Sequence, residues 1–222
     1  MKIVSWNCNG KFREKFKAIK NVDADIYVVQ ECENPQKYIN KEYGYFSKNY
    51  LWIGNDENKG LGIFAKENIK IQKNNWKSYC LRNFLSVKVN DEFDLVGVWA
   101  CKPYIEEYYI YQSINIKKYN KNTIIIGDFN SNLIWDKKHN TRNHTNVVNE
   151  LEHKGLSSAY HIVYNENQGC ESIKTFYLYR HKDKGYHIDY CFIDKNRIKN
   201  FEILNDLNWL KVSDHIPIII EI

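Results

Sequence analysis

The chain has 222 residues, of which 43% are hydrophobic and 27% are charged, and its formal net charge is +5 at pH 7. This composition is typical of a globular domain and excludes a disordered or low-complexity chain. Its apolar runs are all shorter than the roughly 20 residues that a membrane-spanning helix needs, so we expect no membrane partner.

The length and the first residues set further expectations. A chain of this size fits one domain, and we expect a single domain over residues 1–222 that exists as a monomer. The sequence begins directly with a predicted strand and no export segment, which favours a cytoplasmic protein. The six cysteines have no zinc-type spacing, which indicates reduced thiols.

The first half of the chain holds three short apolar runs that each end in a polar residue. Runs of this length and composition are typical of buried strands. The polar residues that end them are Asn7, Glu31, Asp128 and Asn130. The runs themselves are residues 2–6, 25–30 and 123–127.

Two later runs reverse this order, because the polar residue comes first. Asp189 precedes residues 190–193, and Asp214 and His215 precede residues 216–220. If these strands run antiparallel to the earlier three, all five polar ends reach one edge of a sheet. Such a buried polar edge is costly unless a metal or a ligand satisfies it, so the layout predicts a site.

The remaining segments indicate the fold class. Apolar patterns predict further strands and a hairpin at residues 60–65, 81–89, 93–100, 175–179 and 186–193. Helical spacing is found at residues 12–19, 108–119 and 147–151. Many strands with a few helices predict an α+β domain, in which two packed sheets are flanked by helices.

The clustered residue types favour metal chemistry on phosphate esters. Glu31, Asp128 and Asp214 are hard oxygen ligands that suit Mg²⁺, with Mn²⁺ as an alternative. Asp128 can orient or deprotonate an attacking water, which Asn130 helps to position. His215 can donate to the phosphoryl oxygen.

Two more residues complete the predicted catalytic group. Asp189 can hold the second ring nitrogen of His215 and favour its charged form. Asn7 can donate to a phosphate oxygen or hold a neighbouring carboxylate.

Read in order, these segments resemble the endonuclease/exonuclease/phosphatase superfamily. The matching pieces are Ser5-Trp6-Asn7, Gln30-Glu31, Gly127-Asp128-Phe129-Asn130, His187-Ile188-Asp189-Tyr190 and Ser213-Asp214-His215-Ile216-Pro217. The resemblance implies a four-layer α/β sandwich with mostly antiparallel sheets, magnesium dependence and in-line attack by water. It also implies that Glu31 is the principal metal ligand and that Asp214 lies beside the metal.

The chain departs from its DNA-repair relatives at two positions. Asn9 stands where many of them have an aspartate, and we place it among the metal ligands. Cys101 stands where they have a tyrosine, so Lys102 or Tyr104 substitutes for the phenol or the substrate is held differently. These two changes bear on specificity for AP sites more than on the hydrolytic chemistry.

Two loops are expected to border the mouth of the site. Residues 131–144 carry Trp135 and Arg142, and basic residues with a tryptophan suit a nucleic-acid backbone and an unstacked base. The alternative is a solvated, lysine-rich loop with no role in binding. Tyr186 and His187 stand where relatives contact the sugar or phosphate, although the neighbouring aromatic residues also suit a hairpin core.

We therefore expect a DNA-acting nuclease, with DNA repair as the setting that the resemblance implies. Three further alternatives remain open: a phosphatase or a phosphodiesterase of small or lipid phosphates, or a nucleic-acid-binding protein that has lost catalysis. The superfamily shares its chemistry, so the fold cannot decide among them.

Overall fold

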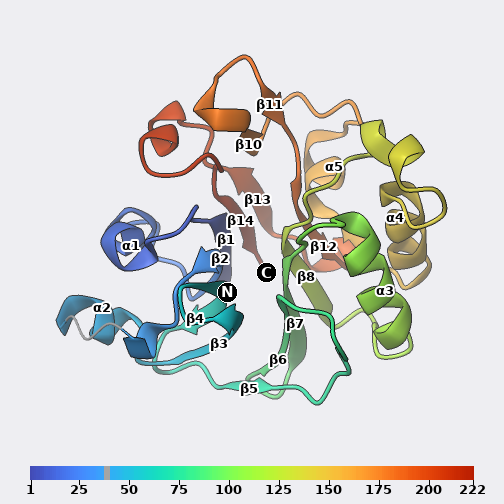
Figure 1. The fold of residues 1–222 in the computed structure, drawn as a ribbon. Coiled ribbons are helices and arrows are strands. Elements are labelled where there is room, and N and C mark those ends of the chain that lie inside the picture. Colours follow the sequence, from blue (N-terminus) through green and yellow to red (C-terminus); the bar gives the residue numbers. More distant parts are fainter. Residues whose placement is uncertain (38–40) are drawn as a thin grey trace.

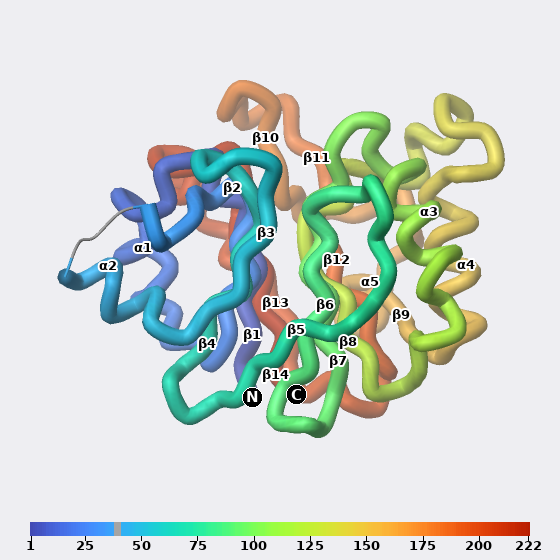
Figure 2. Tube along the Cα trace, turned by 60° about the horizontal axis from the view of Figure 1, so that its bottom comes forward, coloured from blue at the N-terminus to red at the C-terminus, as the bar shows by residue number. Residues whose placement is uncertain are grey.

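The computed structural model describes residues 1–37 and 41–222. Two six-stranded sheets pack face to face, and helices cover the outer face of each (Figure 1). Figure 2 shows the same four layers from another side, with α1 and α2 on one flank and α3 and α4 on the other. The predicted α+β sandwich is confirmed.

The first sheet joins the N-terminal and C-terminal parts of the chain. Its strand order is β13-β14-β1-β2-β4-β3, and only β1 and β2 are parallel neighbours. Its strands are β1 (Lys2–Asn7), β2 (Ile26–Cys32), β3 (Tyr50–Asp56), β4 (Lys59–Ala65), β13 (Asn200–Ile203) and β14 (Ile218–Glu221).

The second sheet has the order β5-β6-β7-β8-β12-β9, with β7 and β8 parallel. A separate two-stranded sheet, β10-β11, lies above the edge opposite the termini (Figure 2). These strands are β5 (Ile71–Lys73), β6 (Phe84–Val89), β7 (Phe93–Trp99), β8 (Thr123–Asp128), β9 (Ser157–Ser158), β10 (Phe176–Tyr177), β11 (Gly185–Tyr186) and β12 (Asp189–Ile193).

The helices are short and lie outside the sheets. The α-helices are α1 (Phe12–Lys20), α2 (Lys41–Phe46), α3 (Ile105–Asn115), α4 (His144–His153) and α5 (Ala159–Tyr164). The 3₁₀ helices are η1 (Pro35–Lys37), η2 (Leu133–Lys138), η3 (Leu178–Arg180), η4 (Lys195–Arg197) and η5 (Leu207–Lys211). None of the helices in the described residues is long and apolar enough to span a membrane.

Three apolar layers hold the sandwich together. Successive side chains of a strand point to opposite faces. In β1, for example, Ile3 joins the layer between the two sheets, and Val4 joins the layer under α1. In β8, Ile126 faces the first sheet while Ile125 packs under α3 and α4. Strands buried on both faces explain why the predicted strands read as continuous apolar runs.

The predicted elements form, with two differences in the second half. The predicted strand at residues 175–179 is limited to β10 (Phe176–Tyr177), because η3 begins at Leu178. The predicted strands at residues 60–65, 93–100 and 123–127 are β4, β7 and β8. The predicted strand 186–193 is instead divided into β11 and β12, because Thr175 Oγ1 accepts hydrogen bonds from the backbone nitrogens of Ile188 and Asp189. A side chain thus replaces a strand partner at this point.

Gly127 brings the end of β8 close to β7. Its φ is +152°, and a Cβ added there would lie 2.0 Å from the carbonyl oxygen of Val98. Such an approach cannot be relieved by a side-chain rotation, because the clashing atom is backbone. The path of the chain into Asp128 therefore requires glycine at position 127.

We expect Gly127→Ala to lower the free energy of unfolding by about 3 kcal/mol or more, through backbone overlap and an unfavourable φ. Gly44→Ala is the control, because an added Cβ in α2 meets nothing within 4 Å. That change should be neutral or stabilise by up to about 1 kcal/mol. Urea unfolding followed by circular dichroism measures both, and equal effects would contradict the assignment.

Candidate active site

The five polar strand ends meet at one edge of the sandwich. Asn7 ends β1, Glu31 is the last residue but one of β2, and Asp128 ends β8. Asp189 begins β12 and pairs directly with Asp128. His215 precedes β14, which runs antiparallel to β1, so its side chain reaches the same edge.

Asp128 is the centre of the site and is fully buried. Its Oδ2 accepts a hydrogen bond from Asn7 Nδ2 at 2.9 Å and another from Asn130 Nδ2 at 2.8 Å. Its Oδ1 accepts from the backbone nitrogen of Asn130 at 2.8 Å. Asn130 has a φ of +47°, a conformation that asparagine tolerates better than most residues, and this turn directs its amide back to the carboxylate.

The Asn7 carboxamide is held in one orientation. Its Oδ1 accepts from the backbone nitrogen of Asn9 at 3.0 Å, so its Nδ2 faces the carboxylates of Asp128 and Glu31. The backbone carbonyl of Asn7 accepts from Ser213 Oγ at 2.6 Å, which fixes the end of β1 to the segment before β14. Asn7 thus contacts one carboxylate from each sheet.

His215 and Asp189 form a buried pair. His215 Nδ1 lies 2.9 Å from Asp189 Oδ2, and His215 Nε2 lies 3.9 Å from Asp128 Oδ2. The ring of Phe176 packs on the imidazole, with ring centroids 4.8 Å apart. This arrangement leaves Nε2 as the ring nitrogen that faces the centre of the site.

The charges of these groups shift one another. Burial by itself would lower the pKa of His215, but the carboxylates of Asp189 and Asp128 outweigh burial and raise that pKa to about 10. Burial raises the pKa of Asp128, and the hydrogen bonds from Asn7 and Asn130 and the charge of His215 oppose that rise. The histidine is therefore a cation between two carboxyl groups at neutral pH.

Glu31 lies at an irregularity of β2. Its φ is +60°, and the pairing of β2 with β4 shifts register between Gln30 and Cys32. This bulge turns the Glu31 side chain toward the catalytic edge, where Oε1 accepts from Asn7 Nδ2 at 3.2 Å. Its Oε2 lies 2.6 Å from Lys59 Nζ, the ammonium of β4.

The donor set fits a hard divalent cation. Carboxylate oxygens of Asp128 and Asp189 lie within 4.8 Å of one another, and the carboxylate of Glu31 is joined to Asp128 through Asn7. Carboxylate oxygens are the ligands that Mg²⁺ and Mn²⁺ prefer.

The remaining predicted metal residues lie nearby. Asp214 is half-buried, and its negative charge acts on both His215 and Lys15. Asn9 is also half-buried, and its contact with Asn7 is made by the backbone nitrogen.

The predicted substrate residues lie in different surroundings. Trp135 of η2 and Tyr186 of β11 are half-buried and touch, with ring centroids 5.1 Å apart. They form a small aromatic surface, which we call the Trp135–Tyr186 platform. Lys102 and Arg142 are exposed, so their charges face solvent.

His187 does not lie where the sequence places it. Its side chain is 2% exposed, its Nδ1 lies 2.9 Å from the carbonyl oxygen of Ile173, and its ring packs on Tyr160 and Tyr190. A buried imidazole is not available to a phosphate. The expectation that His187 contacts substrate is therefore corrected: it packs between β12 and α5.

Three residues support the site through contacts that the sequence does not predict. Lys59 contacts Glu31, Thr175 anchors the chain before Asp189, and Ser213 joins Asn7 to the His215 segment. Only Ser213 gave a signal, as part of the Ser-Asp-His motif. The other two contacts depend on pairing between distant segments.

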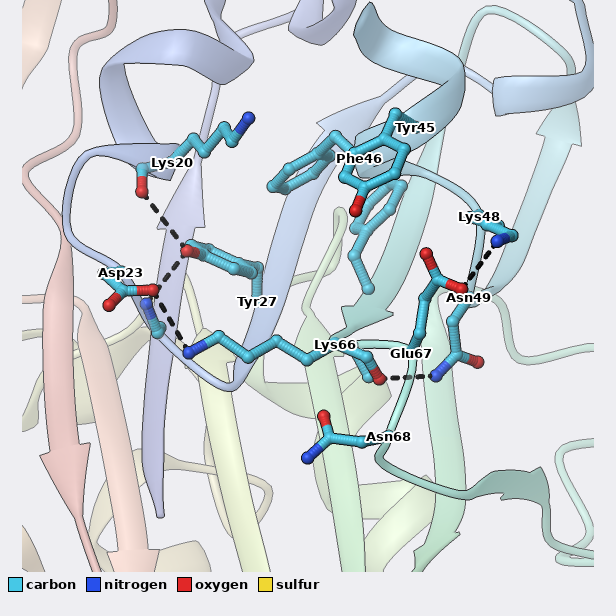
Figure 3. Close-up of a pocket in the computed structure, with 13 residues that line it drawn as sticks. Lys20, Asp23, Tyr27, Tyr45, Phe46, Lys48, Asn49, Lys66, Glu67 and Asn68 are labelled. Carbon is cyan, nitrogen blue, oxygen red and sulfur yellow. Dashed lines mark hydrogen bonds and ion pairs between the residues drawn. The ribbon is translucent and has the colours of Figure 1, made fainter.

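A separate pocket of about 510 Å³ lies at the other edge of the first sheet (Figure 3). Tyr27 from the start of β2 and Phe64 from the end of β4 line it, together with Tyr45 and Phe46 of α2. It contains none of the catalytic residues, so cavity size does not mark the site.

A two-sheet sandwich with carboxylates, amides and a histidine at one edge is compatible with hydrolysis of phosphoester bonds. The sequence matches the Endonuclease/Exonuclease/phosphatase family over residues 4–215, and the chain belongs to that family. No curated protein matches the sequence.

Several solved structures share the fold. A 3'-5' exonuclease from Neisseria meningitidis has a TM-score of 0.70 and 18% identity, over 100% of this chain and 99% of that chain. A structure described as a 3' phosphatase from Neisseria bound to product DNA hairpin has a TM-score of 0.70 and 17% identity, over 100% and 98%. An AP endonuclease from Archaeoglobus fulgidus has a TM-score of 0.72 and 17% identity, over 99% and 98%.

We expect Asp189→Asn to lower the pKa of His215, because the change removes the carboxylate charge that contributes most to raising it. In the unchanged protein that pKa is about 10. Titration of the imidazole by NMR in metal-free buffer measures the shift. Asp91→Asn, an exposed change, serves as the control, and an unchanged His215 titration in Asp189→Asn would contradict the pairing.

We also expect acid to destabilise the fold through His187, whose pKa is lowered by burial from 6.5 to about 4. Below pH 6.5 the unfolded chain binds a proton that the folded chain does not, so stability falls as the pH drops toward 4. The loss amounts to up to about 3 kcal/mol. His187→Gln should flatten this pH dependence in urea unfolding, whereas exposed His181→Gln should not.

Proposed function

We propose that the chain is a divalent-metal-dependent hydrolase of phosphoester bonds in DNA. The observation that carries the proposal is the hydrogen-bonded group of Glu31, Asn7, Asp128 and Asn130 beside the His215–Asp189 pair. This group offers hard oxygen ligands, a proton acceptor and a cation within one edge. A protein that only bound nucleic acid would not need all three.

The relatives support DNA as the substrate. The similar structures are described as a 3'-5' exonuclease, a 3' phosphatase bound to product DNA hairpin and an AP endonuclease. Two of these descriptions name nucleases and one names a 3' phosphatase. Removal of a 3' phosphate is therefore the second candidate activity, at the same site.

The proposed metal ligands are Glu31, Asp214 and Asn9. The carboxylates of Asp128 and Asp189 lie at the same edge of the sandwich. The three proposed ligands would hold Mg²⁺ or Mn²⁺, which would polarise the phosphoryl oxygen and stabilise charge at the leaving group.

Asp128 is the proposed proton acceptor for the attacking water. Burial raises the pKa of its carboxyl group toward the range in which a base works near neutral pH. Asn130 and Asn7 hold Asp128 Oδ2, so the carboxylate cannot rotate away from the edge. A fixed base of this kind orients the water as well as accepting its proton.

His215 is the proposed donor to the phosphoryl oxygen. Its Nδ1 is occupied by Asp189, so the charged ring presents Nε2 to the site. A cation aimed at developing negative charge in a water-poor edge stabilises the transition state more than the ground state. Asp189 acts through His215 by keeping it charged and oriented.

The substrate is proposed to lie across the Trp135–Tyr186 platform. Aromatic rings stack on unpaired bases with little sequence preference, and exposed Lys102 and Arg142 can contact the phosphate backbone. The formal net charge of +5 is consistent with this role.

We expect Mg²⁺-dependent cleavage of DNA that EDTA abolishes. Asp128→Asn and His215→Ala should each lower the turnover number by at least about a hundredfold, because each removes a group placed at the reacting bond. The measurement is hydrolysis of end-labelled single-stranded, double-stranded and 3'-phosphorylated oligonucleotides with Mg²⁺ or Mn²⁺.

Asp91→Asn is the matched control, because Asp91 is exposed and pairs with Lys70 on the surface. It should retain the activity of the unchanged protein. Full activity in both active-site variants would overturn the roles proposed for Asp128 and His215. Turnover of small or lipid phosphates without action on any DNA would overturn the substrate.

A further inference from the structure

Lys59 forms an ion pair with the carboxylate of Glu31, which we propose as the principal metal ligand. Its Nζ lies 2.6 Å from Glu31 Oε2, while Glu31 Oε1 accepts from Asn7 at 3.2 Å. Both oxygens of Glu31 therefore have a partner within the protein. One partner is a neutral amide, and the other is a full positive charge.

Strand pairing fixes the backbone position of Lys59. Lys59 starts β4, and the next residue, Gly60, pairs with Cys32 of β2 and Gly54 of β3. A Cβ at Gly60 would lie 2.2 Å from the carbonyl oxygen of Ile53, so the hairpin is closed tightly at this point. The stem of Lys59 is thus anchored beside the β2 bulge that carries Glu31.

The head of Lys59, in contrast, is reached by solvent. Its side chain is 50% exposed, and its Nζ lies 5.8 Å from the centroid of the Trp99 ring. Its partner Glu31 is less accessible, with 18% of the side chain exposed, so water reaches the pair mainly from the lysine side. This partial exposure weakens the attraction, so a cation that binds Glu31 more strongly can take the place of Lys59.

A divalent cation and an ammonium cannot both lie against the same carboxylate without strong repulsion. Two other nearby cations are held elsewhere, because His215 pairs with Asp189 and Lys15 Nζ donates to the backbone carbonyls of Cys8 and Asn9. Among the described residues, Lys59 is the cation that forms an ion pair with Glu31. The charge of Lys59 therefore opposes the binding of a metal at Glu31.

We propose that Lys59 is an exchangeable counter-ion of Glu31. It competes with the divalent cation for the carboxylate, and once displaced its ammonium faces the phosphate of the bound DNA. The inference rests on the proposed function, because it assumes that Glu31 binds the metal. It assigns to Lys59 both a control of metal affinity and a contact to substrate.

The sign of the change in metal affinity separates this role from a structural one. If Lys59 only holds Glu31 in place, removing its charge leaves the ligand disordered and weakens metal binding. If Lys59 competes with the metal, removing its charge tightens metal binding. Lys59→Met keeps the length of the apolar stem and removes the charge, so it tests the sign directly.

The test is Mn²⁺ binding to the full chain, measured by calorimetry and by electron paramagnetic resonance without substrate. Lys59→Met should bind Mn²⁺ about tenfold more tightly than the unchanged protein, as expected for loss of one partly screened charge beside the ion. Lys59→Arg keeps the charge and should stay close to the unchanged protein. Equal or weaker binding by Lys59→Met would overturn the competition.

The control is Lys48→Met at a surface pair of the same length. Lys48 Nζ lies 2.6 Å from Glu67 Oε2 at the opposite edge of the first sheet, beside the aromatic pocket (Figure 3). Both partners are at least half exposed, with side-chain exposures of 60% and 50%. This change should leave Mn²⁺ affinity unaltered.

A second measurement tests the contact to substrate. With Ca²⁺ to occupy the site, Lys59→Met should bind a fluorescent single-stranded oligonucleotide several-fold more weakly, and its salt dependence should be shallower by about one phosphate contact. Unchanged DNA affinity would overturn this half of the proposal.

Glu31→Gln distinguishes failure of the inference from failure of the proposed function. If Glu31→Gln leaves Mn²⁺ affinity unchanged, Glu31 is not a metal ligand and the proposed site is wrong. If Glu31→Gln weakens binding while Lys59→Met has no effect, the metal site stands and only the role of Lys59 is refuted.

Discussion

The Asp128 carboxylate is the group on which the active site depends. It is fully buried, and a buried charge is tolerated only when hydrogen bonds replace the lost water. Its donors are Asn7 from the first sheet and Asn130 from the turn after β8. Since Ser213 also fixes the carbonyl of Asn7, satisfying one carboxylate ties the two sheets and the last strand together at the catalytic edge.

The same constraint arranges the charges around it. Asp189 pairs with Asp128 across β8 and β12, and two adjacent carboxylates repel unless a cation lies close. His215 supplies that cation and is held by Asp189, so the edge is charged and oriented before any ligand arrives. Lys59 pairs with Glu31 as His215 pairs with Asp189, but the head of Lys59 is half exposed. The site as we propose it thus combines a fixed buried cation with a replaceable one nearer the surface.

The sequence predicts the residues whose signal is local and misses those whose contacts join distant parts of the chain. Asn7, Asp128 and Asp189 are predicted because each directly adjoins an apolar run, which is local information. His187 is misplaced because the chain leaves β11 at Tyr186 and enters β12 at Asp189, so strand alternation does not carry across it. Lys59 carries no local signal, because its contact with Glu31 arises from the pairing of β2 with β4.

The Trp135–Tyr186 platform is joined to the same strands through Asn132, a residue that no local sequence pattern marks. Its Nδ2 lies 3.0 Å from a carboxylate oxygen of Glu171, from the carbonyl oxygen of His187 and from the hydroxyl of Tyr190, and its Oδ1 accepts from the backbone nitrogen of Ile134. One buried amide thereby fixes η2, which carries Trp135, to the strand that begins with Asp189. The η2 side of the platform proposed to hold a base and the charged pair proposed to act on its phosphate are therefore both attached to β12.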